Sequence, residues 1–329
     1  MMNGKDLITA QEWSLEDLEK VLRVAGEMKA DRFGNKYANV LSRKTFLMLF
    51  YNPSLRTRES FECAATELGG HAQFLEPKSM RLKSATAAGE EIRDGAAVMS
   101  RYGGGIGIRI LEDAISEYGE GERVLRGYAR YADVPVISMA HDKYHPCQAL
   151  ADVMGLREHM GSLQGKKMLI MWSSGHLVRS WCSVQSTLLL ALRMGMNVTL
   201  AHPPRYDLDP EVMEQGKRNA EQAGSTFEIA SDLNAAEGAD VVYSRNWMSP
   251  YRYEHGKETE VVMALEHRDW ICDERLMAQT NDAYFIHPMP MERGFEATDG
   301  VVDSKRSIIY DIAENRLHVQ KAVMALTMR

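Results

Sequence analysis

Residues 52–58, Asn-Pro-Ser-Leu-Arg-Thr-Arg, have the types and spacing of an anion-binding segment. They follow an apolar run at 46–50 and precede a helical pattern that two glycines stop at 69–70. This order predicts a buried strand, a tight turn and the start of a helix. Backbone N–H groups at a helix start, together with two guanidinium groups, favour a bound phosphate. Taken alone, the segment leaves a solvated helix start open as the alternative.

Further polar residues follow directly after other predicted strands. In the first half these are Arg109 and the sequence His-Pro-Cys-Gln at 145–148. In the second half they are Arg179, His202, Arg-Asn-Trp at 245–247 and His-Pro-Met-Pro at 287–290. Ligands of doubly wound sheets collect beyond the carboxyl ends of the strands, so we expect these side chains to gather at that edge. Singly, each has a structural explanation, such as a helix cap for His145.

Apolar runs that alternate with helical patterns must position these residues. In the first half, strands are expected at 45–50, 71–75, 105–110 and 134–138, and helices at 14–30, 57–68, 88–102, 121–132 and 145–160. In the second half, strands are expected at 168–172, 197–201, 226–230, 240–244 and 284–287, and helices at 180–194, 210–223 and 273–279. The order predicts an α/β protein with two doubly wound parallel-sheet domains.

The predicted domains are residues 1–150 and 151–312. A last helix at 313–329 follows the final strand, and we expect it to pack back on the first domain. Segment 247–260, rich in Tyr, Arg and Glu, is expected to be a loop over a cleft.

Composition restricts the classes of partner. The 329 residues include 46 acidic and 39 basic side chains, a net charge of −7, without a long block of one sign, which disfavours nucleic acid. Residues 1–20 lack the apolar core of a signal peptide, and no apolar run approaches membrane-spanning length, so we expect a cytoplasmic protein without a membrane partner. The four cysteines form no CxxC pair, which argues against a disulfide framework or a structural zinc site.

Five motifs occur in a characteristic order: 52–58, Gly-Ile-Arg at 107–109, 145–148, 287–290 and Glu-Asn-Arg at 314–316. Together they resemble the aspartate and ornithine carbamoyltransferase family, over nearly the whole chain. Within that family the chain is most similar to the N-acetylornithine and N-succinylornithine carbamoyltransferases and their knotted relatives. The loop 173–183 has the length of the loop through which the N-acylornithine enzymes are knotted but lacks their prolines, which leaves a trefoil knot in the second domain open.

The resemblance implies that carbamoyl phosphate is one substrate. Its implied ligands are Ser54, Leu55, Arg56, Thr57, Arg58, Arg109, His145, Gln148, Met289 and Arg293. Of these, Arg109, His145 and Gln148 would be catalytic, because they would hold the carbamoyl oxygen and amide while an amine attacks the carbonyl carbon. One fixed donor aimed at developing charge typically lowers a barrier by about 3 kcal/mol. The implied chemistry requires no metal and no organic cofactor.

The family also implies a homotrimer with active sites between subunits, in which a loop of one chain reaches into the next. Here that loop would carry Lys83 and Ser84 as ligands. A solvated loop without ligands is the alternative, because the N-acylornithine enzymes place a Trp in this loop and this chain has none there.

The second substrate, the carbamoyl acceptor, is implied less sharply. Its implied ligands are Asp142, Arg179, Arg245, His287, Pro288 and Met289. Pro288 stands where ornithine-type enzymes have Cys, while Glu292 and Glu296 replace basic residues of the N-acylornithine pattern and would suit a more cationic acceptor.

We therefore expect transfer of a carbamoyl group to the amino group of an amino acid or an N-acylated diamino acid, with release of phosphate. The alternatives are an aspartate-type or other acidic acceptor, and a non-catalytic relative that binds anions. The sequence names neither the acceptor nor the direction of the reaction, nor any assembly beyond a trimer.

Overall fold

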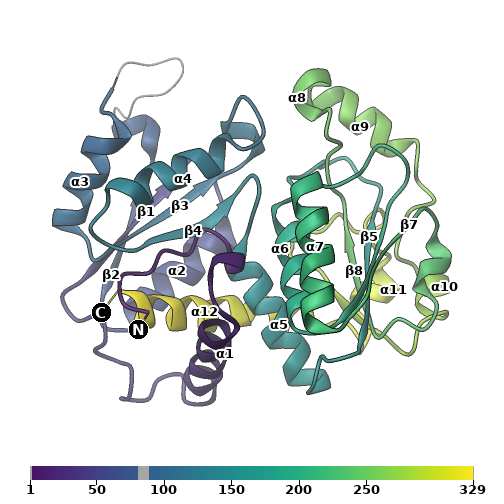
Figure 1. The fold of residues 1–329 in the computed structure, drawn as a ribbon, viewed down its shortest axis with the longest axis horizontal. Coiled ribbons are helices and arrows are strands. Elements are labelled where there is room, and N and C mark those ends of the chain that lie inside the picture. Colours follow the sequence, from purple (N-terminus) through teal and green to yellow (C-terminus); the bar gives the residue numbers. More distant parts are fainter. Residues whose placement is uncertain (1, 81–88, 329) are drawn as a thin grey trace. The chain divides into compact units, whose positions relative to one another are not determined.

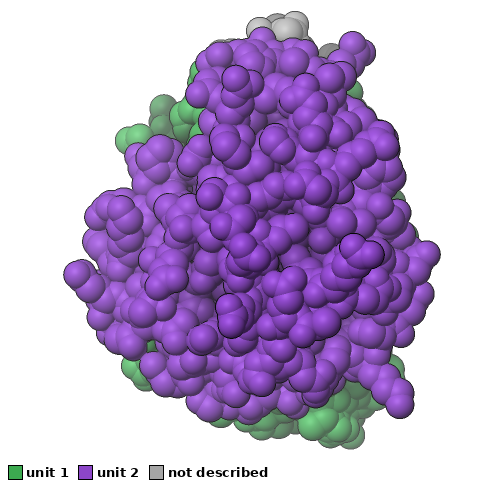
Figure 2. Space-filling model, turned by 90° about the vertical axis from the view of Figure 1, so that its right-hand side faces the viewer, with its two compact units in different colours: residues 1–151, 314–329 green, residues 152–313 purple. Residues whose placement is uncertain are grey.

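A computed structural model of the chain describes residues 2–80 and 89–328. The chain divides into two compact units, Met1–Ala151 with Glu314–Arg329 (unit 1) and Asp152–Ala313 (unit 2), which are coloured separately in Figure 2. Each division lies one residue beyond the predicted domain boundary. Both divisions fall inside helices, α5 (Pro146–Met160) and α12 (Ile309–Thr327), so no linker composition marks them.

Unit 1 contains a four-stranded parallel sheet in the order β2-β1-β3-β4. Its strands are β1 (Thr45–Phe50), β2 (His71–Leu75), β3 (Gly105–Ile110) and β4 (Val136–His141). Its helices are α1 (Leu15–Ala30), α2 (Leu55–Glu67), α3 (Ile92–Tyr102), α4 (Glu120–Tyr131), the first residues of α5 and most of α12, with 3-10 turns η1 (Ala10–Glu12), η2 (Pro77–Met80) and η3 (Glu112–Ala114). The two chain ends lie close together, and the N–H of Gly4 donates to the carbonyl of Thr327 (Figure 1).

Alternate residues of β1 explain how helices cover both faces of this sheet. Leu47 and Leu49 belong to a buried cluster with residues of α3 and α4. Phe46 points to the other face, where its ring stacks on Phe61 of α2 with 5.4 Å between ring centroids. A strand buried on both faces reads as a continuous apolar run, and the sequence 46–50 has that form.

Unit 2 contains a five-stranded parallel sheet in the order β7-β6-β5-β8-β9. Its strands are β5 (Lys167–Trp172), β6 (Asn197–Ala201), β7 (Phe227–Ala230), β8 (Val241–Arg245) and β9 (Tyr284–Ile286). Its helices are the rest of α5, α6 (Cys182–Arg193), α7 (Pro210–Ala223), α8 (Arg252–His255), α9 (Lys257–Leu265), α10 (Glu274–Met277), α11 (Asp299–Val302) and the start of α12, with the 3-10 turn η4 (Leu233–Ala236).

Helices α6 and α7 run side by side along one face of this sheet (Figure 1). The close approach of α7 depends on Gly216, where an added Cβ would lie 2.9 Å from the ring of Phe227 on β7 and 3.3 Å from Leu188 on α6. None of the helices in the described part of the chain is long and apolar enough to cross a membrane.

The predicted α/β class with two parallel sheets is confirmed, and two local predictions are wrong. Segment 247–260 is not a loop, because it carries α8 and the start of α9. The strand expected at 134–138 extends instead from Val136 to His141. Leu7 forms a parallel bridge with Ile137 and exchanges backbone hydrogen bonds with Val136 and Ser138, so a distant segment fixes the extent of this strand.

Candidate active site

The anion-binding segment forms the turn from β1 into α2, as its composition predicts. Ser54 is the N-cap, and its hydroxyl accepts the backbone N–H of Thr57 at 3.3 Å. Leu55 is 74% exposed, while Arg56 is half-buried and Arg58 is exposed. The first backbone N–H groups of a helix lack partners inside the helix, so this turn presents partial positive charge.

The neighbouring strands bring further candidates to the same edge of the unit 1 sheet. In the ladders, Phe50 at the end of β1 pairs with Arg109 of β3, and Arg109 pairs with Ala140 of β4. The side chain of Asn52 accepts the backbone N–H of Leu111 at 2.7 Å, which ties the turn after β1 to the segment after β3. Arg109 therefore lies one strand away from the α2 start.

His145 and Gln148 lie at the beginning of α5, just after β4. Both are nearly inaccessible to solvent, and the N–H of Gln148 donates to the carbonyl of His145 at 3.0 Å. Cys147 between them is also buried, and burial raises the pKa of its thiol to about 12. The cysteine is thus a small apolar residue here, whereas its two polar neighbours carry hydrogen-bonding groups at the carboxyl edge of the sheet.

Asp142, a predicted acceptor ligand, has a structural role at the start of α4. It is fully buried, and its two carboxylate oxygens accept the backbone N–H groups of Gly119 at 2.6 Å and Glu122 at 3.1 Å. These groups belong to the start of α4, so Asp142 caps that helix from outside. An added Cβ at Gly121 would lie 2.6 Å from the carboxylate, which explains the glycine. Burial raises the pKa of Asp142 to about 6 despite these hydrogen bonds.

Arg316 belongs to the motif at 314–316, from which the sequence alone predicts no role for it. Its side chain is buried on α12 and donates to the hydroxyl of Thr57, which is 1% exposed, at 2.9 Å. The last helix thereby fixes the first turn of α2. The motif 314–316 was the available signal, but the partner 259 positions away could not be read from it.

In unit 2, the loop that carries Arg179 is held by aromatic residues at the ends of the strands. Arg179 forms a parallel bridge with Trp247, and its carbonyl accepts the N–H of Met248 at 2.9 Å. The indole N–H of Trp172 donates to the carbonyl of Trp247 at 2.8 Å, and that of Trp247 donates to the carbonyl of Tyr206 at 2.9 Å. These bonds fix the backbone of the loop, so the position of Arg179 is fixed as well. His202, predicted on the same edge, is buried and contacts Trp247 through its ring.

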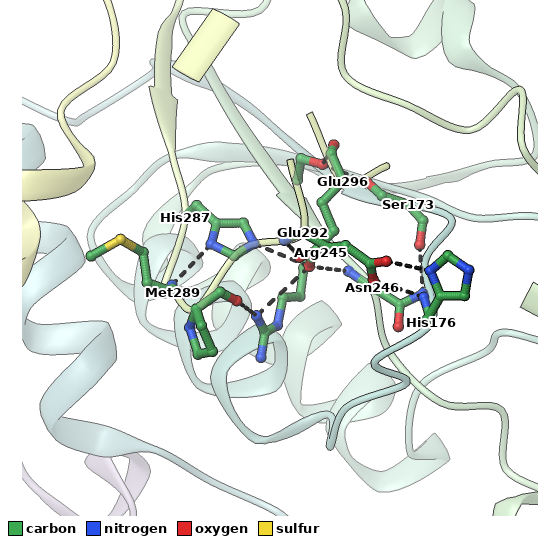
Figure 3. A network of polar contacts seen from close by, with 10 residues as sticks. Ser173, His176, Arg245, Asn246, His287, Met289, Glu292 and Glu296 are labelled. Atoms are coloured by element: carbon green, nitrogen blue, oxygen red, sulfur yellow. Dashed lines mark hydrogen bonds and ion pairs between the residues drawn. The ribbon is translucent and has the colours of Figure 1, made fainter. Parts of the chain in front are cut away.

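Arg245 and His287, at the ends of β8 and β9, meet at Glu296 (Figure 3). One oxygen of this fully buried carboxylate accepts the N–H of Asn246 at 2.8 Å and lies 3.1 Å from Nε2 of His287. The other oxygen accepts the N–H of Glu292 at 2.7 Å. The guanidinium of Arg245 lies 3.7 Å from Glu296 and donates to the carbonyl of Pro290 at 3.1 Å.

These contacts determine the charges of the network. Burial lowers the pKa of His287, more than the nearby carboxylate raises it. The N–H of Met289 donates to Nδ1 of His287 at 2.9 Å, so the proton of the neutral ring is on Nε2. Burial acts to raise the pKa of Glu296, but His287, Arg245 and the N–H of Asn246 together lower it, and the side chain is ionised.

The two acidic replacements therefore have internal partners. Both carboxylate oxygens of Glu296 accept hydrogen bonds within the network. One carboxylate oxygen of Glu292 contacts the ring of His176, and the other accepts the backbone N–H of His176 at 2.8 Å (Figure 3). The expectation that these residues favour a more cationic acceptor loses its basis. The predicted ligand Arg293 is likewise engaged elsewhere, in ion pairs with Asp299 at 2.6 Å and Asp303 at 2.8 Å that raise its pKa.

Three further observations limit the site. Lys83 and Ser84 lie outside the described residues. A cavity of about 360 Å³ in unit 2 contains none of the predicted site residues, because it is lined by Lys167, Asn197, Thr199, Glu228 and Glu237 near the beginnings of β5 and β6. Within residues 2–80 and 89–328, no group of three or more His, Cys, Asp or Glu side chains is arranged to hold a metal ion.

Comparison with known proteins agrees with this arrangement. Residues 5–158 match the family described as aspartate/ornithine carbamoyltransferase, carbamoyl-P binding domain, and residues 164–327 match its Asp/Orn binding domain. The chain belongs to the aspartate/ornithine carbamoyltransferase family.

Several relatives are similar over nearly their full length. The N-acetylornithine carbamoyltransferase of Xanthomonas campestris pv. campestris is 37% identical, with 98% of each chain covered. The ornithine carbamoyltransferase of Thermococcus kodakarensis is 36% identical, with 99% of this chain and 96% of that protein covered. A crystal structure of acetylornithine transcarbamylase complexed with acetylcitrulline superposes with a TM-score of 0.90 at 37% identity, covering 98% of both chains.

Proposed function

We propose that this protein transfers the carbamoyl group of carbamoyl phosphate to the amino group of an amino acid or an N-acylated diamino acid. The observation that carries the proposal is the edge of the unit 1 sheet. There the α2 start with Ser54, Arg56 and Arg58 lies beside Arg109, and His145 and Gln148 follow the next strand. Such a set suits a phosphate attached to a small polar carbonyl group.

In the proposed reaction, a neutral amine attacks the carbonyl carbon. A C–N bond forms, the C–O bond to phosphate breaks, and the nitrogen loses one proton. The α2 start, with Ser54, Leu55, Arg56, Thr57 and Arg58, would hold the departing phosphate. Arg109, His145 and Gln148 would hold the carbamoyl oxygen and amide, where fixed donors stabilise the charge that develops. Met289 and Arg293 stay proposed ligands of carbamoyl phosphate; for Arg293 this requires that it leave Asp299 and Asp303.

On the acceptor side, we assign Arg179, Arg245, His287, Pro288 and Met289 of unit 2. Asp142 of unit 1 stays a proposed acceptor ligand; this requires that it leave the N–H groups of Gly119 and Glu122. Arg179 is placed on a braced loop, and its guanidinium group is suited to a carboxylate. The relatives named for N-acetylornithine and a structure solved with carbamoyl phosphate and N-succinyl-L-norvaline support an N-acylated amino acid as the acceptor class. Pro288, an aspartate-type feature of the sequence, favours acidic acceptors as the second candidate.

Phosphate release from carbamoyl phosphate, measured across a panel of amines, tests the function. The panel contains N-acetylornithine, N-succinylornithine, ornithine, aspartate and a no-amine control. We expect release that depends on an N-acylated diamino acid; dependence on aspartate would instead support the second candidate. Absence of amine-dependent release with all of them would leave an anion-binding protein without transferase activity.

We also propose, from the family resemblance, a homotrimer in the cytoplasm, in which Lys83 and Ser84 of one chain serve the site of the next. Light scattering of the purified protein tests the trimer. Mixing an Arg56→Ala chain with a Lys83→Ala chain tests the shared site, because hybrid trimers would regain activity at sites built from intact halves.

A further inference from the structure

The loop that follows β9 is organised around one buried carboxylate. Glu296 is 0% exposed and accepts hydrogen bonds from two backbone N–H groups, those of Asn246 and Glu292. It also contacts Nε2 of His287 and the guanidinium of Arg245. A single side chain thus joins the end of β8, the end of β9 and the turn at 292 (Figure 3).

We infer that Glu296 is a positioning residue for the acceptor side of the proposed reaction: it fixes the Nε2–H tautomer of His287 and the orientation of Arg245. The inference rests on the proposed function only where it names the acceptor. The geometric part concerns residues of unit 2 alone and stands without it.

His287 is held in one tautomer from both sides of its ring. On one side, Nδ1 accepts the N–H of Met289, a residue with φ of 50°, which is unfavourable for a side chain with a Cβ. On the other side, Nε2 donates to Glu296. If the proton moved to Nδ1, it would face the N–H of Met289, and Glu296 would face an unprotonated nitrogen. The carboxylate therefore also helps to hold the strained turn at Met289.

The guanidinium of Arg245 is held through its Nη1, whereas its Nε has no hydrogen-bond partner in the described part of the chain. Its Nη1 donates to the carbonyl of Pro290 and lies near Glu296. Its Nε is buried and makes no hydrogen bond within the described residues. Glu296 and the carbonyl of Pro290 thus fix the direction of the Arg245 guanidinium through its Nη1.

Replacement of Glu296 by Gln has a specific consequence. Both carboxylate oxygens accept N–H groups, so the amide NH₂ of glutamine would face at least one donor. The change keeps the volume but removes the ion pair and leaves a buried donor without an acceptor. Glu260 offers a matched control, because it is equally buried in unit 2 and accepts the N–H of Ser249 at 2.8 Å and its hydroxyl.

The first experiment measures the tautomer of His287 by two-bond ¹H–¹⁵N spectra of protein labelled in its ten histidines, with His287→Gln for assignment. We expect a single neutral Nε2–H form in the unaltered protein without any substrate. Glu296→Gln should give the averaged pattern of exchanging tautomers, whereas Glu260→Gln should leave the pattern unchanged. A cationic or Nδ1–H His287 in the unaltered protein would overturn the inference, and so would an unchanged pattern in Glu296→Gln.

The second experiment measures kinetics with the best acceptor of the panel. Glu296→Gln should raise the acceptor KM by about tenfold or more, and change the dissociation constant of carbamoyl phosphate by less than about threefold. Glu260→Gln should leave both constants within about threefold, even if it melts at a lower temperature. If the two variants changed the acceptor KM equally, Glu296 would stabilise the protein generally and would have no specific positioning role.

The failures of the two proposals are distinguishable. If the unaltered protein carbamoylates no acceptor, the proposed function fails, and the histidine spectra still decide whether Glu296 fixes His287. If Glu296→Gln does not fold, the spectrum of the unaltered protein remains decisive. The shorter Glu296→Asp then serves as the second variant, with an expected acceptor KM above that of the unaltered protein.

Discussion

Replacement of Asp142 by Ala tests whether this residue acts as a cap of α4 or as a ligand of the carbamoyl acceptor. The change removes the acceptor of two backbone N–H groups, those of Gly119 and Glu122, at the start of α4. Each buried donor left without a partner costs about 1–3 kcal/mol, and water can reach the half-buried Gly119 and Glu122. We therefore expect a loss of about 2–4 kcal/mol in the free energy of unfolding, at or above the upper end of the range for lost N-caps.

The raised pKa of Asp142 gives this loss a pH dependence. The folded-state pKa, about 6, lies above the ordinary value of 3.8, so the folded chain prefers the protonated form. The side chain contributes its full stability below pH 3.8, and part of it is lost as the pH rises through 6. Between pH 5 and pH 7, the stability difference between the unaltered protein and Asp142→Ala should narrow by about 1.4 kcal/mol.

Urea unfolding followed by circular dichroism at both pH values measures this effect, with Asp133→Ala as the control. Asp133 is an exposed aspartate of the same unit, and its replacement should change stability by less than about 0.5 kcal/mol. The cap interpretation would be refuted if Asp142→Ala unfolded like the unaltered protein but raised the acceptor KM by more than about tenfold.

Three further outcomes are expected. Arg56→Ala should weaken carbamoyl phosphate binding in calorimetry by about 100-fold, the value of one or two charge-assisted hydrogen bonds, while leaving the fold intact; unchanged affinity would remove the phosphate site from the α2 start. Burial and the positive charges of Arg126 and Lys143 lower the pKa of His141 to about 3. Unfolded chains therefore bind a proton at this position that the folded chain does not. The stability difference between the unaltered protein and His141→Gln should shift against the unaltered protein by up to about 1.4 kcal/mol per unit as the pH drops below 6.5. In thiol labelling of the folded protein, exposed Cys63 should react and buried Cys147 should not; equal rates would contradict the burial.

Local patterns were sufficient to predict most of the fold. The strand at 45–50, the tight turn after it and the helix that follows depend on residues that are neighbours in sequence, and the structure has them there. Parallel strands align their carboxyl ends, so the shared edge of Arg109 and the residues after β4 also followed from the strand assignments.

What the sequence did not reveal depends on partners far away in the chain. The N–H groups that Asp142 caps belong to the start of α4, about 20 residues earlier. The contacts of Glu296 with Asn246 and His287 arise only when the ends of β8 and β9 meet the loop that follows β9, so its charge alone did not reveal its role. A polar segment such as 247–260 gives no apolar periodicity, and its buried Glu260 is satisfied by Ser249 through a turn that sequence does not reveal.

The pairing of Arg245 with Glu296 has a consequence for how substrates arrive. Two opposite charges 3.7 Å apart form a dipole, whose potential falls off faster with distance than that of a lone charge. Arg245 therefore adds little to the long-range attraction of an acidic molecule, and its effect begins only on contact. The rate at which an acceptor reaches this part of the protein should be set by diffusion and by other charges, and salt should hardly change the contribution of Arg245.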